Sequence, residues 1–551
     1  MSTNMSTGKL GSLSYFCLLF AALLAVFLPT FSNPPRSDFW PLLHHFQQFQ
    51  SLPSWDRALN VVNYDICGHG TYRPLFHVFL YWMHLFSGAD YFRFHAAVFA
   101  VYCLNIALLY RLARKFGSGR SISLAFLTVF AFLFSHFDIV AWTFHIGILI
   151  GFGLFLLGFS AYLSYLRARG VIRLTAAAAL FLAGLLCYEI FILWPAGAIF
   201  LLLSRRGELL KRGWLRAAAV STAAALAAVF ILYGALVSLA RSHSSVAGLA
   251  SAPPDFFSPS SLSFSLAVST AGIAAEGLAA VDPFLVSPGL IHDNIGRGGV
   301  LLEVSPLLPY MKRPGNGSAA SPLILPREVA PERIWLENEP AIDAVLAIAG
   351  FLVILAAAAA AFASWKKRGV IVSTPVAFAL FLLVTETFVL YHGRMATNPP
   401  IYILSEFRYQ YVTDALLILL GILGCGRMLG ALPRIRLPLY SLLAAILLAN
   451  LAVLIPHLSA IERQLAPLHR MLSNIRTGLE DGRITPEHPL YLDDAIAREL
   501  PRLCWNRNLA GFTSGSYQWI FSPAALASFA CERPQASWVV ERRDLSVVPA
   551  E

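Results

Sequence analysis

Long apolar runs separated by short polar segments make up most of this chain. Several reach the roughly 20 residues that a helix needs to cross a bilayer, and 57% of the 551 residues are hydrophobic while 13% are charged. The pattern predicts an all-α polytopic membrane protein with 11 to 13 transmembrane helices. The runs lie at 13–30, 74–110, 121–135, 139–166, 174–204, 214–240, 341–365, 370–391, 409–425 and 437–456.

The first run follows Lys9 and has no small-residue cleavage site after it. We therefore interpret residues 13–30 as an uncleaved signal anchor rather than a removed signal peptide. No repeat with a period of 20 to 50 residues is visible, so the chain is not a solenoid.

Basic residues gather in short clusters between the apolar runs. The net charge of +10 is compatible with nucleic-acid binding, but this clustering is typical of cytoplasmic topology signals, so we exclude that class. If all clusters are cytoplasmic, each segment between two of them crosses the membrane an even number of times. The clusters lie at 111–120, 167–173, 205–216, 366–368 and 427–436.

This parity predicts which segments lie outside. The outer segments are a first loop at 32–73, a large loop at 241–340 and a tail at 457–551. Run 174–204 has basic clusters on both sides, so we expect a tight hairpin that turns near Tyr188-Glu189, and we expect the turn His136-Phe137-Asp138 to face outward. The weakly apolar segment 263–280 would break the parity as a span, so it lies in the interface or re-enters.

One segment conflicts with the parity. Residues 74–110 must cross an odd number of times, yet Ser87-Gly88-Ala89-Asp90 divides them into two helices of near-spanning length. Either one of these helices is only partly inserted, or the cluster at Arg111 is an exception to the rule.

Two domains follow from the pattern: a membrane body at 1–456 and an external C-terminal domain at 457–551. The tail combines a polar helical stretch at 461–479 with short candidate strands at 490–492 and 538–540, which predicts a small α+β domain. Cys504 and Cys531 are its cysteines, and the outer compartment is oxidising, so we predict a disulfide between them. The alternative is two buried thiols.

Ionisable groups in or beside a membrane are costly unless they are paired or hydrated, which makes them candidates for function. The predicted topology brings many of them to the outer side, and this convergence indicates an external site. They are Asp38, Asp56, Asp65, His69, Arg73, Asp138, Glu189, His392, Arg394, Glu406 and Arg408.

Each candidate also has a structural interpretation. Arg73 directly precedes a span, where an arginine can extend to lipid headgroups, but its guanidinium also suits phosphate oxygens. Asp38 can cap the helix that follows it, or it can take a proton from an acceptor hydroxyl. Asp138 and Glu189 lie in tight turns, where they either cap helices or act at the site. No histidine or cysteine spacing indicates a metal site, so we predict none.

Several segments resemble the GT-C superfamily of polyprenyl-phosphate-sugar-dependent glycosyltransferases, and most closely the membrane part of transmembrane O-mannosyltransferases that carry tetratricopeptide repeats. That resemblance implies a GT-C-like fold, Asp38 as the catalytic group, Arg73 and Arg408 on the lipid phosphate, and Tyr72 in support. From the predicted outer position, we expect Asp138, Glu189 and Arg394 to support the site as well. The similar segments are Asp38, Tyr72-Arg73-Pro74-Leu75, Gly88, Phe94-His95, 108–114, Leu186-Cys187-Tyr188-Glu189 and 406–411.

The chain also departs from this family. Tyr188 stands where the family has a lysine, one residue is inserted between Glu406 and Arg408, and Asp38 is a single acid where the family often has two. The tetratricopeptide repeats are absent, so the acceptor of the repeat-bearing members does not carry over.

The resemblance implies an inverting transfer of a sugar from a polyprenyl-phosphate donor to an external glycan, lipid or protein hydroxyl. We expect the protein in a bacterial inner membrane, with its site facing the periplasm. We expect no required cofactor, and a divalent cation is an open alternative that no motif supports. The alternative functions are a ligase or polymerase of lipid-linked glycans, and a transporter or flippase of a lipid-linked or anionic substrate.

Overall fold

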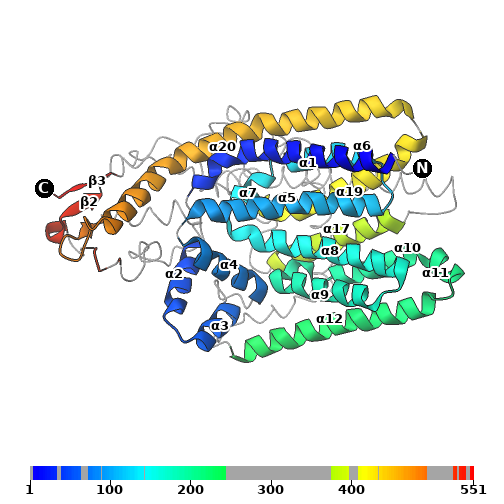
Figure 1. Ribbon diagram of the computed structural model, residues 1–551, viewed down its shortest axis with the longest axis horizontal. Coiled ribbons are helices and arrows are strands. Elements are labelled where there is room, and N and C mark those ends of the chain that lie inside the picture. The colour runs from blue at the N-terminus through cyan, green and yellow to red at the C-terminus, as the bar shows by residue number, and fades with distance from the viewer. Residues whose placement is uncertain are drawn as a thin grey trace.

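The computed structural model shows a helical bundle with a small sheet near its C-terminal end (Figure 1). This confirms the predicted class of a mostly helical protein with several apolar helices and a small C-terminal sheet. The structure describes residues 4–33, 39–63, 72–88, 90–141, 143–243, 374–395, 407–431, 433–492, 525, 527–529, 533–540 and 546–550.

The described helices follow the apolar runs closely. Short 3₁₀ helices, labelled η, connect several of them. The elements are α1 Asn4–Phe27, η1 Leu28–Ser32, α2 Phe39–Gln50, α3 Ser54–Asn63, α4 Pro74–Ser87, α5 Tyr91–Lys115, α6 Arg120–Ala131, α7 His136–Ala141, η2 Thr143–His145, α8 Ile146–Ala168, α9 Val171–Cys187, η3 Glu189–Phe191, η4 Trp194–Ala196, α10 Gly197–Ser204, α11 Arg206–Lys211, α12 Leu215–His243, α17 Thr374–Met395, α19 Phe407–Ala431, η7 Pro433–Ile435, α20 Arg436–Glu480, η10 Arg533–Gln535, and strands β1 Leu490–Tyr491, β2 Trp538–Val540 and β3 Val547–Pro549.

Within this described part, five segments are long and apolar enough to cross a membrane, and five further apolar helices are shorter. The five spans are Ser12–Ser32, Tyr91–Lys115, Thr143–Ala168, Leu215–Ala240 and Arg436–Pro456. The apolar run at 341–365 and the large loop at 241–340 fall wholly or mostly outside the described residues. The count of 11 to 13 spans therefore stays a prediction.

The structure favours one solution to the conflict at 74–110. A break at Gly88, whose φ is +56°, ends α4 before α5 begins. The 25-residue α5 is a candidate span, whereas the 14-residue α4 is not, and α4 lies beside α2 and α3 at one end of the bundle (left in Figure 1). One full crossing by α5 is the odd number that the basic cluster at Arg111 requires.

Three of the basic clusters meet at the opposite end of the bundle. A guanidinium nitrogen of Arg167 donates to the carbonyl oxygen of Lys115 at 3.1 Å, Arg212 donates to Arg167 O at 2.8 Å, and Arg169 donates to Arg212 O at 2.7 Å. These bonds join the ends of α5, α8 and the connection between α11 and α12. Following the topology predicted from the sequence, we call this the inner end and the end with α2, α3 and α4 the outer end.

The expected hairpin at 174–204 is present. Helix α9 ends at Cys187, the chain turns through η3 and η4, and α10 follows. Helices α8 and α9 approach closely because glycines face aromatic rings: a Cβ on Gly184 would lie 2.5 Å from Phe155, and one on Gly158 would lie 2.6 Å from Phe181. This contact fixes where the turn after α9 lies.

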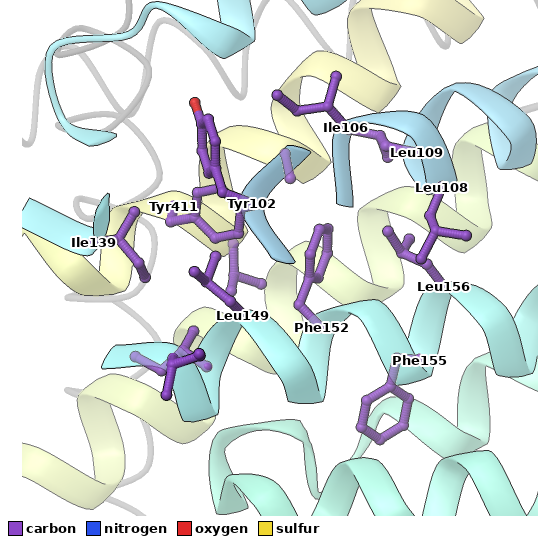
Figure 2. Close-up of a cluster of buried hydrophobic side chains, with 14 of the residues drawn as sticks. Tyr102, Ile106, Leu108, Leu109, Ile139, Leu149, Phe152, Phe155, Leu156 and Tyr411 are labelled. Carbon is purple, nitrogen blue, oxygen red and sulfur yellow. The ribbon is translucent and has the colours of Figure 1, made fainter. Parts of the chain in front are cut away.

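The turn expected at 136–138 is buried at His136 and Phe137, which the sequence pattern did not predict, and whether it lies on the outer side of the membrane stays a prediction. These residues begin α7, which packs against α5 and α19, and both side chains are fully buried. The reason is that α6 ends at Ala131, so the chain enters α7 inside the bundle rather than beyond it. The core around this point contains Tyr102 of α5, Phe152 of α8 and Tyr411 of α19 (Figure 2).

Helix α20 extends from the inner end to the C-terminal sheet without a break for 45 residues. It includes both the predicted last span and the predicted tail helix at 461–479, so the predicted domain boundary at 456 falls inside one helix. The predicted strands at 490–492 and 538–540 are present as β1 and β2, which pair in parallel, and β3 adds antiparallel to β2. The two-domain division itself stays a prediction.

Candidate functional site

The outer end of the bundle holds an ion pair between two residues that are 116 positions apart. Arg73 Nε donates to Glu189 Oε2 at 2.6 Å, and Arg73 Nη2 donates to Glu189 Oε1, so the guanidinium meets the carboxylate with two parallel bonds. The Arg73 side chain is 9% exposed and that of Glu189 is 34% exposed. The pair is therefore desolvated on the arginine side and accessible on the carboxylate side.

Local sequence positions both partners. Arg73 is the residue before Pro74, and proline is favoured at the first position of a helix because its fixed φ suits the turn and its missing N–H has no intrahelical role there. Glu189 opens η3 directly after α9 has ended in the extended residue Tyr188. Because α4 packs against α9, the start of one helix meets the end of the other.

An aromatic ring packs against the arginine. The Arg73 Cζ atom lies 3.8 Å from the centroid of the Tyr188 ring, which is a cation–π contact. Tyr188 replaces the lysine expected from the family resemblance. Its ring therefore packs against the guanidinium, and no second cation is added at this position. Tyr72 directly precedes Arg73 in the sequence. Partial burial raises the pKa of its phenol, so this group stays neutral at pH 7.

The structure joins two of the predicted site residues, Arg73 and Glu189, and leaves the others as predictions. Asp38 and the two cysteines Cys504 and Cys531 lie outside the described residues. Asp138 lies on α7, Arg394 on α17 and Arg408 on α19, and only the backbone of these three residues is described. Asp138 and Arg408 share neighbouring elements, since α7 packs against α19.

A second group of ionisable residues lies inside the bundle and was missed by the sequence analysis as a site. Ser135 Oγ donates to Asp414 Oδ2 at 2.7 Å, and His136 Nε2 lies 3.6 Å from the same oxygen. On the neighbouring helix α17, Glu386 Oε2 accepts a bond of 2.7 Å from Thr413 Oγ1. All of these side chains are buried. We call Ser135, His136, Glu386, Thr413 and Asp414 the buried polar cluster.

A signal for this cluster was present in the sequence. Glu386 and Asp414 are acids within apolar runs, which is unusual enough to mark a residue for attention. What the sequence does not show is that α17 and α19 lie side by side and bring the two acids to adjacent turns. Among the described residues, no group of three or more histidine, cysteine or acidic side chains is arranged to hold a metal ion.

Chemically, the outer site offers a fixed cation beside a partly hydrated carboxylate. A guanidinium that is bound along one edge keeps the planar, fork-shaped geometry that suits hydrogen bonds to the oxygens of an anion. The start of α4 adds the partial positive charge of a helix N-terminus at the same place. The site is therefore suited to an anionic oxygen ligand with a carboxylate next to it.

Comparisons with known proteins identify no family for this chain. No family model matches the sequence, and no curated protein matches it. Among solved structures, ArnT from Cupriavidus metallidurans in the apo state is similar at a TM-score of 0.39 and 13% identity, over 91% of this chain and 85% of that one. The same protein bound to undecaprenyl phosphate is similar at a TM-score of 0.38 and 13% identity, over 90% and 85%. These values are too low to define a shared fold.

Proposed function

We propose that this protein is a membrane glycosyltransferase of the GT-C type, which moves a sugar from a polyprenyl-phosphate donor to an acceptor hydroxyl on the outer side of the membrane. The observation that carries the proposal is the Arg73–Glu189 pair at the outer end of the bundle. It combines a cation for the lipid phosphate with a carboxylate next to the place where the sugar would lie.

The leaving group of such a transfer is a lipid phosphate, whose negative charge grows as the bond to the sugar breaks. A positioned guanidinium in a partly dry site stabilises that charge more than water does, because it is already oriented. Arg73 meets this condition through its two bonds to Glu189 and its contact with Tyr188. In our proposal, Arg408 at the start of α19 provides a second cation.

The proton of the acceptor hydroxyl has to be accepted as the sugar is transferred. We assign this step to Asp38, which the family resemblance implies and which precedes α2 by one residue. The acceptor oxygen attacks the anomeric carbon, the bond between that carbon and the phosphate oxygen breaks, and the polyprenyl phosphate leaves with both bonding electrons. Glu189 orients Arg73 throughout.

A second candidate function is transport of a lipid-linked or anionic substrate. One observation favours it: the buried polar cluster lies within the bundle, and Asp414 is seven residues into α19, or about 10 Å from its outer start at 1.5 Å per residue. A substrate path needs ionisable groups at such depth. We place this function second because the partly buried ion pair of Arg73 and Glu189 at the outer end supports transfer more directly.

The test uses glycans and glycoproteins from cells that carry the wild-type protein, the Asp38→Asn variant or a deletion, analysed by mass spectrometry. We expect one sugar-bearing species to disappear in the deletion and to stay absent with Asp38→Asn, because the amide cannot accept the proton. Full transfer by Asp38→Asn would falsify the catalytic assignment.

A binding measurement separates the two candidate functions. Full-length protein in nanodiscs is titrated with undecaprenyl phosphate and, as the control, with undecaprenol. We expect the phosphate form alone to bind. Movement of the labelled lipid across a bilayer without any change in glycans would instead support transport.

A further inference from the structure

The buried polar cluster places ionisable groups in the interior of the bundle, where their burial is destabilising. Both Asp414 and Glu386 are almost fully buried, and each has one carboxyl oxygen, Oδ1 and Oε1 respectively, without a hydrogen-bond partner among the described residues. Leaving such a group unsatisfied is destabilising, and more so if it is charged. Apolar residues of similar shape would stabilise the bundle better, so the cluster needs an explanation beyond stability.

The hydrogen bonds of His136 determine where its protons lie. The Tyr102 hydroxyl lies 2.8 Å from both Ala131 O and His136 Nδ1. A carbonyl oxygen can only accept, so the single phenol proton is used on Ala131, and the bond to His136 requires a proton on Nδ1. The other ring nitrogen, Nε2, then faces Asp414 Oδ2 at 3.6 Å.

This distance is beyond hydrogen-bond range, so the contact between His136 Nε2 and Asp414 Oδ2 is a close approach of two buried polar atoms. Ser135 Oγ reinforces it from the chain that leads into α7.

The helices that this pair joins carry two of the candidate site residues. His136 begins α7, and Asp138 lies two residues further along the same short helix. Asp414 lies on α19, and Arg408 lies six residues before it, nearer the outer start of that helix. Any shift between α7 and α19 would therefore change the separation of Asp138 and Arg408.

Neighbouring contacts restrict the pair to one arrangement. The ring centroids of His136 and Tyr411 are 5.0 Å apart, and those of His136 and Phe130 are 4.6 Å apart. Asn450 of α20 accepts a bond from Phe134 N at 2.8 Å, which fixes the chain just before Ser135. Four elements, α5, α6, α19 and α20, thus hold the start of α7.

We infer that His136 and Asp414 are positioning residues for the lipid-phosphate site: the contact between them, together with the hydrogen bond from Ser135 to Asp414, sets the position of α19, and with it Arg408, relative to α7. This inference rests on the proposed function, because it assigns Arg408 to the lipid phosphate. It explains the cost of the cluster, since directional bonds specify one register between two helices where apolar contacts would allow several.

The test is a double-mutant cycle on the full-length protein in nanodiscs, with undecaprenyl phosphate as the probe. Asp414→Asn keeps the shape of the side chain and replaces one carboxyl oxygen of these contacts with an amide nitrogen, and we expect affinity to fall roughly tenfold, in the range of couplings between residues that act together. Arg408→Ala lowers affinity directly. If Asp414 acts through Arg408, the double variant binds no more weakly than Arg408→Ala alone.

A matched control is Thr222→Val. It removes a buried bond of 2.7 Å between Thr222 and Tyr162 in the same bundle, on α12 and α8, which carry no candidate site residue. We expect it to lower the melting temperature about as much as Asp414→Asn and to leave lipid binding unchanged. A general loss of stability would lower binding in both variants and would add to the effect of Arg408→Ala.

The outcomes separate the inference from the proposed function. If the wild type binds undecaprenyl phosphate no better than undecaprenol, the proposed function fails. If the wild type binds the phosphate form and Asp414→Asn binds equally well, or if its effect adds fully to that of Arg408→Ala, the inference is overturned while the function stands. Normal binding by Arg408→Ala alone also overturns it.

Discussion

The two ends of the helix bundle use arginine in different ways. At the inner end, Arg167, Arg169 and Arg212 donate to backbone carbonyl oxygens near the surface, and their side chains cover the ends of helices. At the outer end, Arg73 is buried and makes two bonds to one carboxylate. The same residue type thus covers helix ends at one end of the bundle and forms a partly buried ion pair at the other, and what separates the two is burial with a carboxylate partner.

This difference explains why counting charges does not locate a site. Arg167, Arg169 and Arg212 at the inner end bond to backbone carbonyl oxygens at exposed positions, so the contribution of each to binding one ligand is small. Arg73 at the outer end is held in one orientation, so an anion meets it without a further loss of side-chain freedom. Three experiments break or sharpen the contrast between the ends.

The largest expected effect concerns which end faces outward. Alkaline phosphatase, which is active only outside the cytoplasm, is fused after Glu551 in one strain and after Lys211 in another. We expect activity in the first strain and none in the second, because cations of the inner end act as cytoplasmic signals. The reverse pattern would overturn the outer placement of Arg73 and Glu189.

The second experiment compares one arginine from each end. Arg73→Ala removes a charge-assisted contact to phosphate worth about 1.5–3 kcal/mol, which corresponds to a roughly 10- to 100-fold loss of affinity for undecaprenyl phosphate. Arg212→Ala, the matched control, removes a cation whose bond is to Arg167 O, and it should leave affinity unchanged within about twofold, as expected for surface charges. Equal losses in both variants would mean that net positive charge, rather than the pair, binds the lipid.

The smallest effect comes from Glu189→Gln. The amide keeps an oxygen that accepts from Arg73 but removes the negative charge that competes with phosphate. We expect undecaprenyl phosphate to bind a few-fold more tightly, since a loss of about 1 kcal/mol of competing attraction changes affinity about fivefold. Weaker binding by this variant would show instead that the full ion pair is needed to hold Arg73 in place. The thermal stability of the variant serves as its control.

Much of the fold could be predicted from the sequence because bilayer-spanning helices follow from local composition. The turn at Tyr188-Glu189, the strands at 490–492 and 538–540 and the break after Ser87 all follow from short-range patterns. Where the sequence pattern did not predict the structure, the deciding contact was between distant segments. The burial of His136 depends on α5, α19 and α20, which no pattern near position 136 reveals.

The candidate site divides in the same way. Arg73 and Glu189 could be selected one by one, because each is an ionisable residue at the predicted edge of the membrane. Their pairing spans 116 positions and depends on α4 packing against α9. Asp414 and Glu386 were overlooked since each is a single acid in an apolar run, and only the adjacency of α17 and α19 makes them a cluster.

Helix α20 fixes both the direction in which the C-terminal sheet lies and its distance from the inner end of the bundle. Its 45 residues span about 68 Å at 1.5 Å per residue. Near its far end, an Arg476 guanidinium nitrogen donates to Tyr91 Oη at 3.2 Å, so the helix is clamped to the outer start of α5. Because each residue turns a helix by about 100°, one residue inserted before this clamp would rotate the sheet to another side of the bundle, whereas seven would raise it by about two turns and nearly restore its direction. The length of α20 therefore sets how far the sheet lies from the inner end, and the rotation of the helix sets which side of the bundle the sheet lies on.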